Sequence, residues 1–184
     1  FLALLVTPFK KTKAYEKGII DENGKRIKKP PFSSIEDRED YSNYYTRFIR
    51  LVFNIKKLLA KAPGGKTRIA SYAAALYLIK EDFGVSERKI KQGLNEYGVD
   101  FNDFLSENTQ WFMLEDRELS PGVYTLSENK VLNSTYEEMA FRGDRIRISN
   151  ESFPIGDIFG LDIYEAIHMP TNQKIFVTAG EIRK

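Results

Sequence analysis

A chain of 184 residues, of which 42% are hydrophobic and 13% aromatic, can bury a core of its own, so disorder throughout is excluded. Its 28 Lys and Arg against 26 Asp and Glu leave a net charge of +2, which excludes the strongly basic balance of a dedicated nucleic-acid binder. With no Cys, the chain has no disulfide, no thiolate nucleophile and no thiolate metal ligand.

The first 33 residues are rich in cations, with seven Lys and one Arg against three acids, and hold few positions suited to a core. They predict an extended basic arm, residues 1–33. Its apolar start, Phe1 to Val6, is too short to span a membrane, so no membrane contact is expected. Inside the arm, Asn23-Gly24 separates two short β-prone stretches, which predicts a β-hairpin with positive φ at both central residues.

A helical unit is predicted for residues 34–98. Ser33 or Ser34 can cap its first helix, because acids follow in the first turn. Apolar residues then recur at helical spacing from Tyr41 to Ala62, which predicts one long helix of roughly 40 Å. Pro and Gly at positions 63–65 would end it.

Two further helices complete this predicted three-helix unit. The second is expected from Lys66 to Phe83, where several alanines allow close packing against the first helix, and Gly84 can end it. Ser86 can cap the third helix and Gly98 can end it.

Beyond residue 98 the composition changes, and residues 99–184 form the third predicted unit. An acidic connector comes first, with six acids and one Arg between positions 99 and 118. Gly, Pro, Asn and Ser then separate five β-prone stretches, at 123–126, 130–132, 144–149, 158–166 and 173–178. Short strands at this spacing predict a small antiparallel, barrel-like module of SH3-like size. The predicted fold class is therefore α+β.

A run of cations without any acid lies on the predicted first helix and in the segment after it. It consists of Arg47, Arg50, Lys56, Lys57, Lys61, Lys66 and Arg68. Such a cationic stripe can neutralise the phosphates of DNA, and it equally fits a solvated face or a face that pairs with an acidic partner subunit. These residues are therefore candidate contacts for nucleic acid or for an acidic partner.

The second and third helices resemble a helix-turn-helix, with Gly84 at the turn. The recognition helix would present Glu87, Arg88 and Lys91 to a DNA groove. However, Lys80 stands where the motif wants a small residue, and Gly93 stands where it wants an apolar one. A plain helical hairpin with good caps explains the same residues, so both alternatives stay open.

Patterns for catalysis and metal binding are weak. His168 is the only histidine, which leaves no second His to share a metal or to relay a proton. Gly65-Lys66-Thr67 copies the end of a phosphate-binding loop, but Ala60 stands where the first Gly is needed. The sequence predicts neither an enzyme nor a bound cofactor.

Three stretches carry a resemblance to a known family. They are Thr7-Pro8-Phe9-Lys10-Lys11-Thr12 leading to Ala14-Tyr15 and Gly18-Ile19-Ile20-Asp21, Asn54-Ile55-Lys56-Lys57-Leu58-Leu59 leading to Pro63-Gly64-Gly65-Lys66, and Gly156-Asp157-Ile158-Phe159-Gly160-Leu161-Asp162-Ile163-Tyr164-Glu165. Together they resemble virion-associated structural proteins of large tailed bacteriophages.

The resemblance implies a structural component of a tailed-phage virion, in the head (the capsid), the neck or the head-tail connector. Such a protein is made in the host cytoplasm and is held by contacts with other virion proteins in a symmetric assembly. Packaged double-stranded DNA would be a further contact of the cationic stripe. The alternative function is that of a phage-encoded helix-turn-helix regulator that binds DNA.

Overall fold

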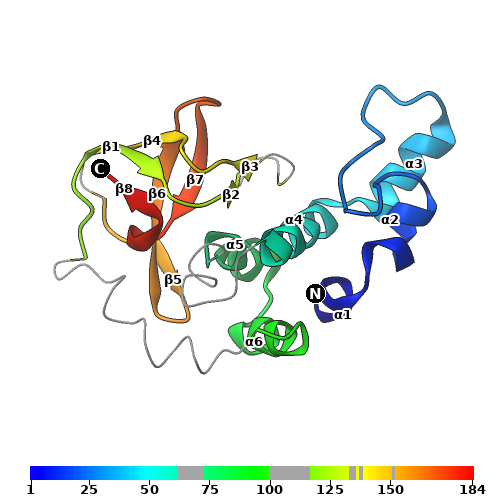
Figure 1. Cartoon of the computed structure of the whole chain (residues 1–184), viewed down its shortest axis with the longest axis horizontal. Helices are drawn as coiled ribbons and strands as arrows, with labels where there is room; N and C mark the ends of the chain where they lie inside the picture. Colours follow the sequence, from blue (N-terminus) through cyan, green and yellow to red (C-terminus); the bar gives the residue numbers. More distant parts are fainter. Residues whose placement is uncertain (62–72, 100–116, 133–135, 137–138, 151) are drawn as a thin grey trace.

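The computed structural model describes residues 1–61, 73–99, 117–132, 136, 139–150 and 152–184 (Figure 1). Within these residues, helices fill the N-terminal half and an antiparallel sheet fills the C-terminal part, which confirms the α+β class. No helix among them is long and apolar enough to cross a membrane. Most of the acidic connector lies outside the described residues, as do Gly65, Lys66, Thr67 and Arg68.

The N-terminal segment is folded, and the prediction of an extended arm is wrong. The segment forms α1 (Leu2–Val6), the 3-10 turn η1 (Phe9–Lys11) and α2 (Lys13–Glu16). Its buried apolar residues are Leu5, Ala14, Ile19 and Ile20. They are few, but each one reaches the helices that follow, and this contact supplies the free energy that orders the segment.

The expected reversal at Asn23-Gly24 is present, but it is not a type I′ turn. Ile20 and Arg26 form an isolated antiparallel bridge across it. Of the two central residues only Gly24 has a positive φ, at +76°. The Asp21 carboxylate holds the loop, because its Oδ1 accepts the backbone N–H groups of Asn23 at 2.8 Å and of Lys25 at 2.9 Å.

The predicted long helix is in fact two helices, α3 (Ile35–Tyr44) and α4 (Arg47–Lys61). Ser34 caps α3 as predicted, because its hydroxyl accepts a backbone N–H of the first turn. Tyr45 then leaves the helical region at φ −137° and ψ 47°, and the hydroxyl of Thr46 accepts a backbone N–H of α4. The one-helix prediction is wrong because Thr46 offers a cap inside an apolar pattern that continues across it.

The two helices predicted for the following residues are present, as α5 (Ala73–Phe83) and α6 (Glu87–Glu96). Gly84 ends α5 at φ +64°, and Ser86 caps α6. Every residue of α5 from Ala73 to Ile79 is buried, because this helix contacts α4 as well as the β-sheet (Figure 1).

The sheet lies in the C-terminal part of the chain. Its strands are β1 (Gly122–Leu126), β2 (Lys130–Val131), β3 (Met139–Ala140), β4 (Arg145–Ile148), β5 (Gly156–Ile158), β6 (Leu161–His168), β7 (Gln173–Val177) and β8 (Ile182–Arg183), and the 3-10 turn η3 (Ala179–Glu181) precedes β8. The main sheet runs in the order β5-β6-β4-β1-β8, with β7 also paired to β6, while β2 and β3 form a separate pair. The main sheet does not close into a barrel, so the barrel prediction is wrong and the SH3-like arrangement is not confirmed.

The five predicted strands correspond to β1, β2, β4, β6 and β7, whereas the short strands β3, β5 and β8 were not predicted. The prediction is clearly wrong for residues 158–166, because one predicted strand is divided between β5 and β6. Phe159 and Gly160 have positive φ values of 52° and 79°, and Ile158 pairs with Leu161 across them. A Phe in this conformation is uncommon, so Phe159-Gly160 lacks the Asn-Gly or Asp-Gly pair that usually signals such a turn.

Three clusters of buried side chains hold the elements together. The largest joins the helices to the sheet, with Ile55 and Leu76 packed in the same cluster as Ile158 and Ile163. A second cluster lies within the sheet, and a third holds the N-terminal segment against Phe53 of α4. Buried residues from both sides of positions 33 and 98, the predicted unit boundaries, thus belong to common clusters.

Candidate partner-binding groove

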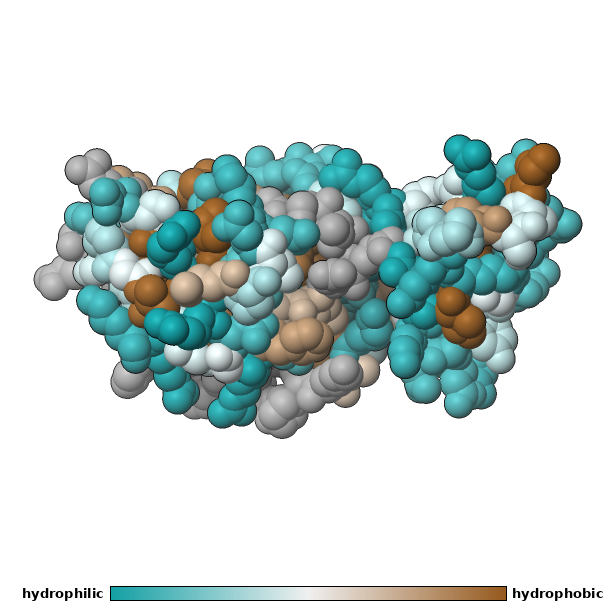
Figure 2. All heavy atoms as spheres, turned by 90° about the horizontal axis from the view of Figure 1, so that it is seen from above, coloured by the Kyte–Doolittle hydropathy of each residue, from teal (hydrophilic) through white to brown (hydrophobic). Residues whose placement is uncertain are grey.

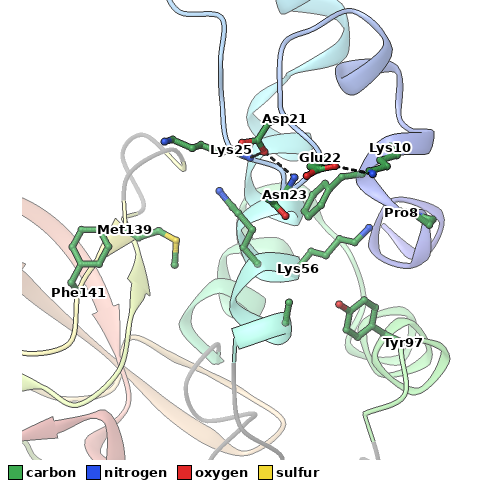
Figure 3. Close-up of a pocket in the computed structure, with 13 residues that line it drawn as sticks. Pro8, Lys10, Asp21, Glu22, Asn23, Lys25, Lys56, Tyr97, Met139 and Phe141 are labelled. Atoms are coloured by element: carbon green, nitrogen blue, oxygen red, sulfur yellow. Dashed lines mark hydrogen bonds and ion pairs between the residues drawn. The ribbon is translucent and has the colours of Figure 1, made fainter.

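A groove of about 990 Å³ lies where the N-terminal segment, α4 and the β2–β3 pair face one another (Figure 3). Its described lining comes from parts of the chain that are far apart in sequence, and it mixes four lysines with two acids and three aromatic side chains. A groove of this size is in the range of sites that bind small molecules or peptide side chains. We call it the partner groove below.

Lys56 is the buried cation of the partner groove. It is only 6% exposed, its ammonium donates to the carbonyl oxygen of Thr7, and Nζ lies 4.5 Å from the centre of the Phe9 ring. Burial lowers the pKa of Lys56, and no carboxylate of a described residue pairs with it. A backbone carbonyl and the face of a ring therefore hold this charge in place of an acid.

The rim on the N-terminal side is the loop from Asp21 to Lys25. Gly24 packs directly on Phe9, since a Cβ at this position would lie 2.5 Å from the Phe9 Cζ. Phe9 in turn meets Phe53 of α4 edge to face, with ring centres 5.2 Å apart. The loop, the ring below Lys56 and α4 thus form one packed stack.

The opposite wall belongs to the β module. Met139 and Phe141 line it, and Phe141 is 60% exposed, which is unusual for a large apolar side chain. The backbone N–H of Phe141 donates to Asp144 Oδ2 at 2.8 Å. Burial acts to raise the pKa of Asp144, but this N–H and His168 together lower that pKa below its ordinary value.

Among the four members of the cationic stripe whose side chains are described, Lys56 is buried, so these four do not share one exposed face. Arg47 lies 5.0 Å over the Tyr136 ring, and Arg50 lies 6.0 Å over the Tyr45 ring. Of the stripe, only Lys56 and Lys57 line the partner groove among the residues whose side chains are described. The Lys61 side chain, Lys66 and Arg68 lie outside that part of the structure.

The residues of the alternative recognition helix lie on α6. Arg88 is exposed, Lys91 is half-buried, and Glu87 pairs with Lys80 at 2.9 Å. α1 covers one face of α6, where a Cβ at Gly93 would meet the Phe1 ring at 2.8 Å. The packing of Phe1 therefore explains why Gly93 stands where the helix-turn-helix motif wants an apolar residue.

The sequence contains a signal that Lys56 is buried, although it also fits the cationic stripe. Lys56 lies four residues after Val52 and three before Leu59, both of which are fully buried. This spacing places Lys56 on the apolar face of α4. No local signal identifies Phe9 as its neighbour, or Tyr97, Met139 and Phe141 as residues that line the same groove, because these segments are brought together only by the tertiary fold.

His168 has a structural environment. The ring is 3% exposed, Nε2 lies 2.9 Å from Asp144 Oδ2, and Nδ1 lies 2.7 Å from Thr171 Oγ1. Both ring nitrogens are therefore occupied, and His168 ties the turn before β4 to the turn after β6. Within the described parts of the chain, no group of three or more His, Asp and Glu could hold a metal ion.

Comparisons of the chain with protein-family models, with curated proteins and with solved structures find no match. The resemblance to virion-associated phage proteins therefore remains a prediction that rests on the three sequence stretches alone. The groove and its chemistry are the structural features that bear on the function of this chain.

Proposed function

We propose that this protein is a structural component of a tailed-phage virion, in the head, neck or connector region, and that it acts through contacts with other virion proteins rather than through catalysis. The observation that carries the proposal is the partner groove, in which cations and apolar side chains from three parts of the fold converge. Mixed walls of this kind suit the recognition of a protein segment.

The rest of the surface also agrees with a role in assembly. In the view of Figure 2, the surface over α2 and α3 is mostly hydrophilic, with a few isolated apolar side chains. Exposed apolar residues also occur on the β module, at Phe141, Phe153 and Ile155. A partner that covers the β module would remove these side chains from water.

The test is to purify particles of the encoding phage and to quantify this chain against the major capsid protein by mass spectrometry after a high-salt wash. We expect a fixed ratio that survives the wash and whose value indicates the symmetry of the site. Absence of the chain from washed particles would contradict the proposal.

The second candidate function is a DNA-binding regulator. It is favoured by the α5–α6 hairpin, whose turn at Gly84 leaves Arg88 exposed at the start of α6. A regulator should bind free duplex DNA with a steep salt dependence, and Arg88→Ala should weaken that binding. A virion protein needs no affinity for free duplex, so one binding assay separates the two candidates.

A further inference from the structure

We propose that the partner groove binds an acidic peptide segment of a partner protein, with a carboxylate against Lys56 and an apolar side chain against Met139 and Phe141. This inference rests on the proposed function, because it gives the chemistry of one of the protein contacts. It stands on the burial of Lys56, on the exposed apolar wall and on the charge of the rim.

Lys56 is the anchor for the carboxylate. An ammonium has three donors, and among the described residues only the Thr7 carbonyl accepts from this one. A buried cation without an acid costs free energy, which a bound carboxylate would recover as a charge-assisted hydrogen bond. Because Lys56 lines the groove while being 6% exposed, the carboxylate has to enter the groove to reach it.

The apolar wall provides the second contact. In Figure 3, Met139 and Phe141 lie on one side of α4, whereas Lys56 and Tyr97 lie on the other side, and the Lys56 side chain runs toward Pro8. The backbone of Phe141 is held by its N–H bond to Asp144, and its ring is 60% exposed. A side chain of the partner would cover this ring and remove it from water.

The charge of the rim favours an acidic segment over a basic one. The described lining of the groove carries four lysines against two acids, of which Glu22 pairs with Lys10 at 2.8 Å and Asp21 Oδ1 accepts two backbone N–H groups. Lys25 is exposed on the same loop. The charge left to face a ligand is therefore positive.

Duplex DNA fits this site poorly. Phosphates of a rigid double helix are reached by exposed cations, whereas Lys56 is buried inside a groove with aromatic and apolar walls. A single strand could stack its bases on such walls, so it is the competing ligand that an experiment has to include.

The experiment titrates the isotope-labelled full chain with a soluble eight-residue peptide, acetylated and amidated, in which glutamates surround one phenylalanine. The control peptide carries glutamine in place of every glutamate, and the competing probe is oligothymidine. Binding is followed by amide chemical shifts, which report the site and the fold of each variant at once. We expect the acidic peptide to shift resonances of the loop 21–25 and of Phe141, and the glutamine peptide to bind more weakly.

Two variants with matched controls test the contacts. Lys56→Met and Phe141→Ser should each lower the affinity for the acidic peptide by about tenfold or more. This is the effect of losing one charge-assisted hydrogen bond or one buried aromatic contact. Lys29→Met removes an exposed lysine outside the groove, and Phe153→Ser removes a 58% exposed phenylalanine that does not line it. Both controls should bind the peptide as the unchanged protein does.

The inference is overturned if the acidic peptide fails to bind, if it binds Lys56→Met as tightly as the unchanged chain, or if only oligothymidine occupies the groove. Shifts at the groove that depend on protein concentration without any peptide would assign it to a second copy of the chain, and would also overturn the inference. None of these results bears on whether the chain is present in washed particles, so the proposed function and the groove chemistry can fail separately.

Discussion

Two buried lysines, one in the β module and one in the helical part, have contrasting surroundings. Lys130 of β2 is 1% exposed and pairs with Glu181, which is equally buried. Lys56 of α4 is 6% exposed and has a carbonyl and a ring but no carboxylate among the described residues. In a buried ion pair, the attraction between the charges offsets part of the free energy lost on removing them from water. A buried cation without an acid lacks this compensation and lowers the stability of the fold. The difference separates a lysine that serves the core from one that is available to a ligand.

Glu181, the acid that pairs with Lys130, is also bonded to the backbone around η3. Glu181 Oε2 accepts the backbone N–H of Thr178 at 2.7 Å, which completes the capping box of η3. The backbone N–H of Ser127 donates to the Glu181 carbonyl oxygen at 2.8 Å. Burial lowers the pKa of Lys130 well below its ordinary value, and the charge of Glu128 offsets part of this effect.

The largest effect is expected from Glu181→Ala, which leaves Lys130 buried without its acid. It should lower the free energy of unfolding by about 3–5 kcal/mol, the usual cost of breaking a buried pair on one side. Urea unfolding measures this change. The double variant Lys130→Met with Glu181→Leu replaces both charges by apolar groups and should recover most of the loss. If the double variant is as unstable as the single one, the pair is not the reason for the effect.

The sequence was most informative where a structural feature depends on neighbouring residues. Ser34 and Ser86 were predicted as helix caps, and Gly84 and Gly98 as helix ends, and the structure has Ser side chains that accept backbone N–H groups and Gly residues with positive φ at these positions. Each of these depends only on a local conformational preference.

The sequence was least informative where a contact joins distant segments. Lys56 was grouped with six other cations on one stripe, yet it is buried because Thr7 and Phe9 lie against it, almost 50 residues earlier in the chain. The partner groove could not be predicted for the same reason, since Met139 and Phe141 reach it from the other end of the fold. Composition describes the charge of a segment but does not say which side chains it will cover.

Gly24→Ala should have the next largest effect on stability, and it changes the surroundings of Lys56. An alanine at this position is strained by the φ of +76°, and its Cβ would lie 2.5 Å from the Phe9 ring. The ring beside Lys56 therefore has to move. We expect a loss of about 1–3 kcal/mol in thermal or urea unfolding and weaker binding of the acidic peptide.

Gly98→Ala is the matched control for this change. Its φ is +91°, but nothing lies within 4 Å of the new Cβ. It should show only the conformational cost of about 1 kcal/mol and leave peptide binding intact. Equal effects of the two variants would mean that Phe9 does not position Lys56.

Lys56→Met should raise stability where Glu181→Ala lowers it. The substitution removes a buried charge that has no acid and keeps an unbranched apolar side chain of similar length, so we expect a gain of about 1–2 kcal/mol in urea unfolding. A gain in stability together with a loss of peptide binding is the signature of a residue kept for function. A clear loss of stability would show that the Thr7 contact makes Lys56 a structural residue instead.

The pH dependence of stability tests whether Lys56 is a buried cation without an acid. The pKa of Lys56 is lowered from its ordinary value of 10.5 in the folded protein, so between the lowered pKa and 10.5 the unfolded chain binds the proton that the folded chain releases. Stability contributed by this site therefore rises with pH across that interval. The advantage of Lys56→Met over the unchanged protein should be largest at neutral pH and shrink as the pH approaches 10.5. A constant difference would mean that Lys56 titrates normally.

The smallest effect on stability is expected for the exposed ion pair of Lys10 and Glu22. Its nitrogen and oxygen lie 2.8 Å apart, but the two side chains remain 62% and 57% exposed. Glu22 raises the pKa of Lys10, yet water and salt screen this attraction. Glu22→Gln should therefore leave the unfolding midpoint unchanged within error in the same urea assay that detects Glu181→Ala. Since both substitutions remove an acid from one lysine, a measurable loss at Glu22 would mean that burial is not what distinguishes the lysine sites of this protein.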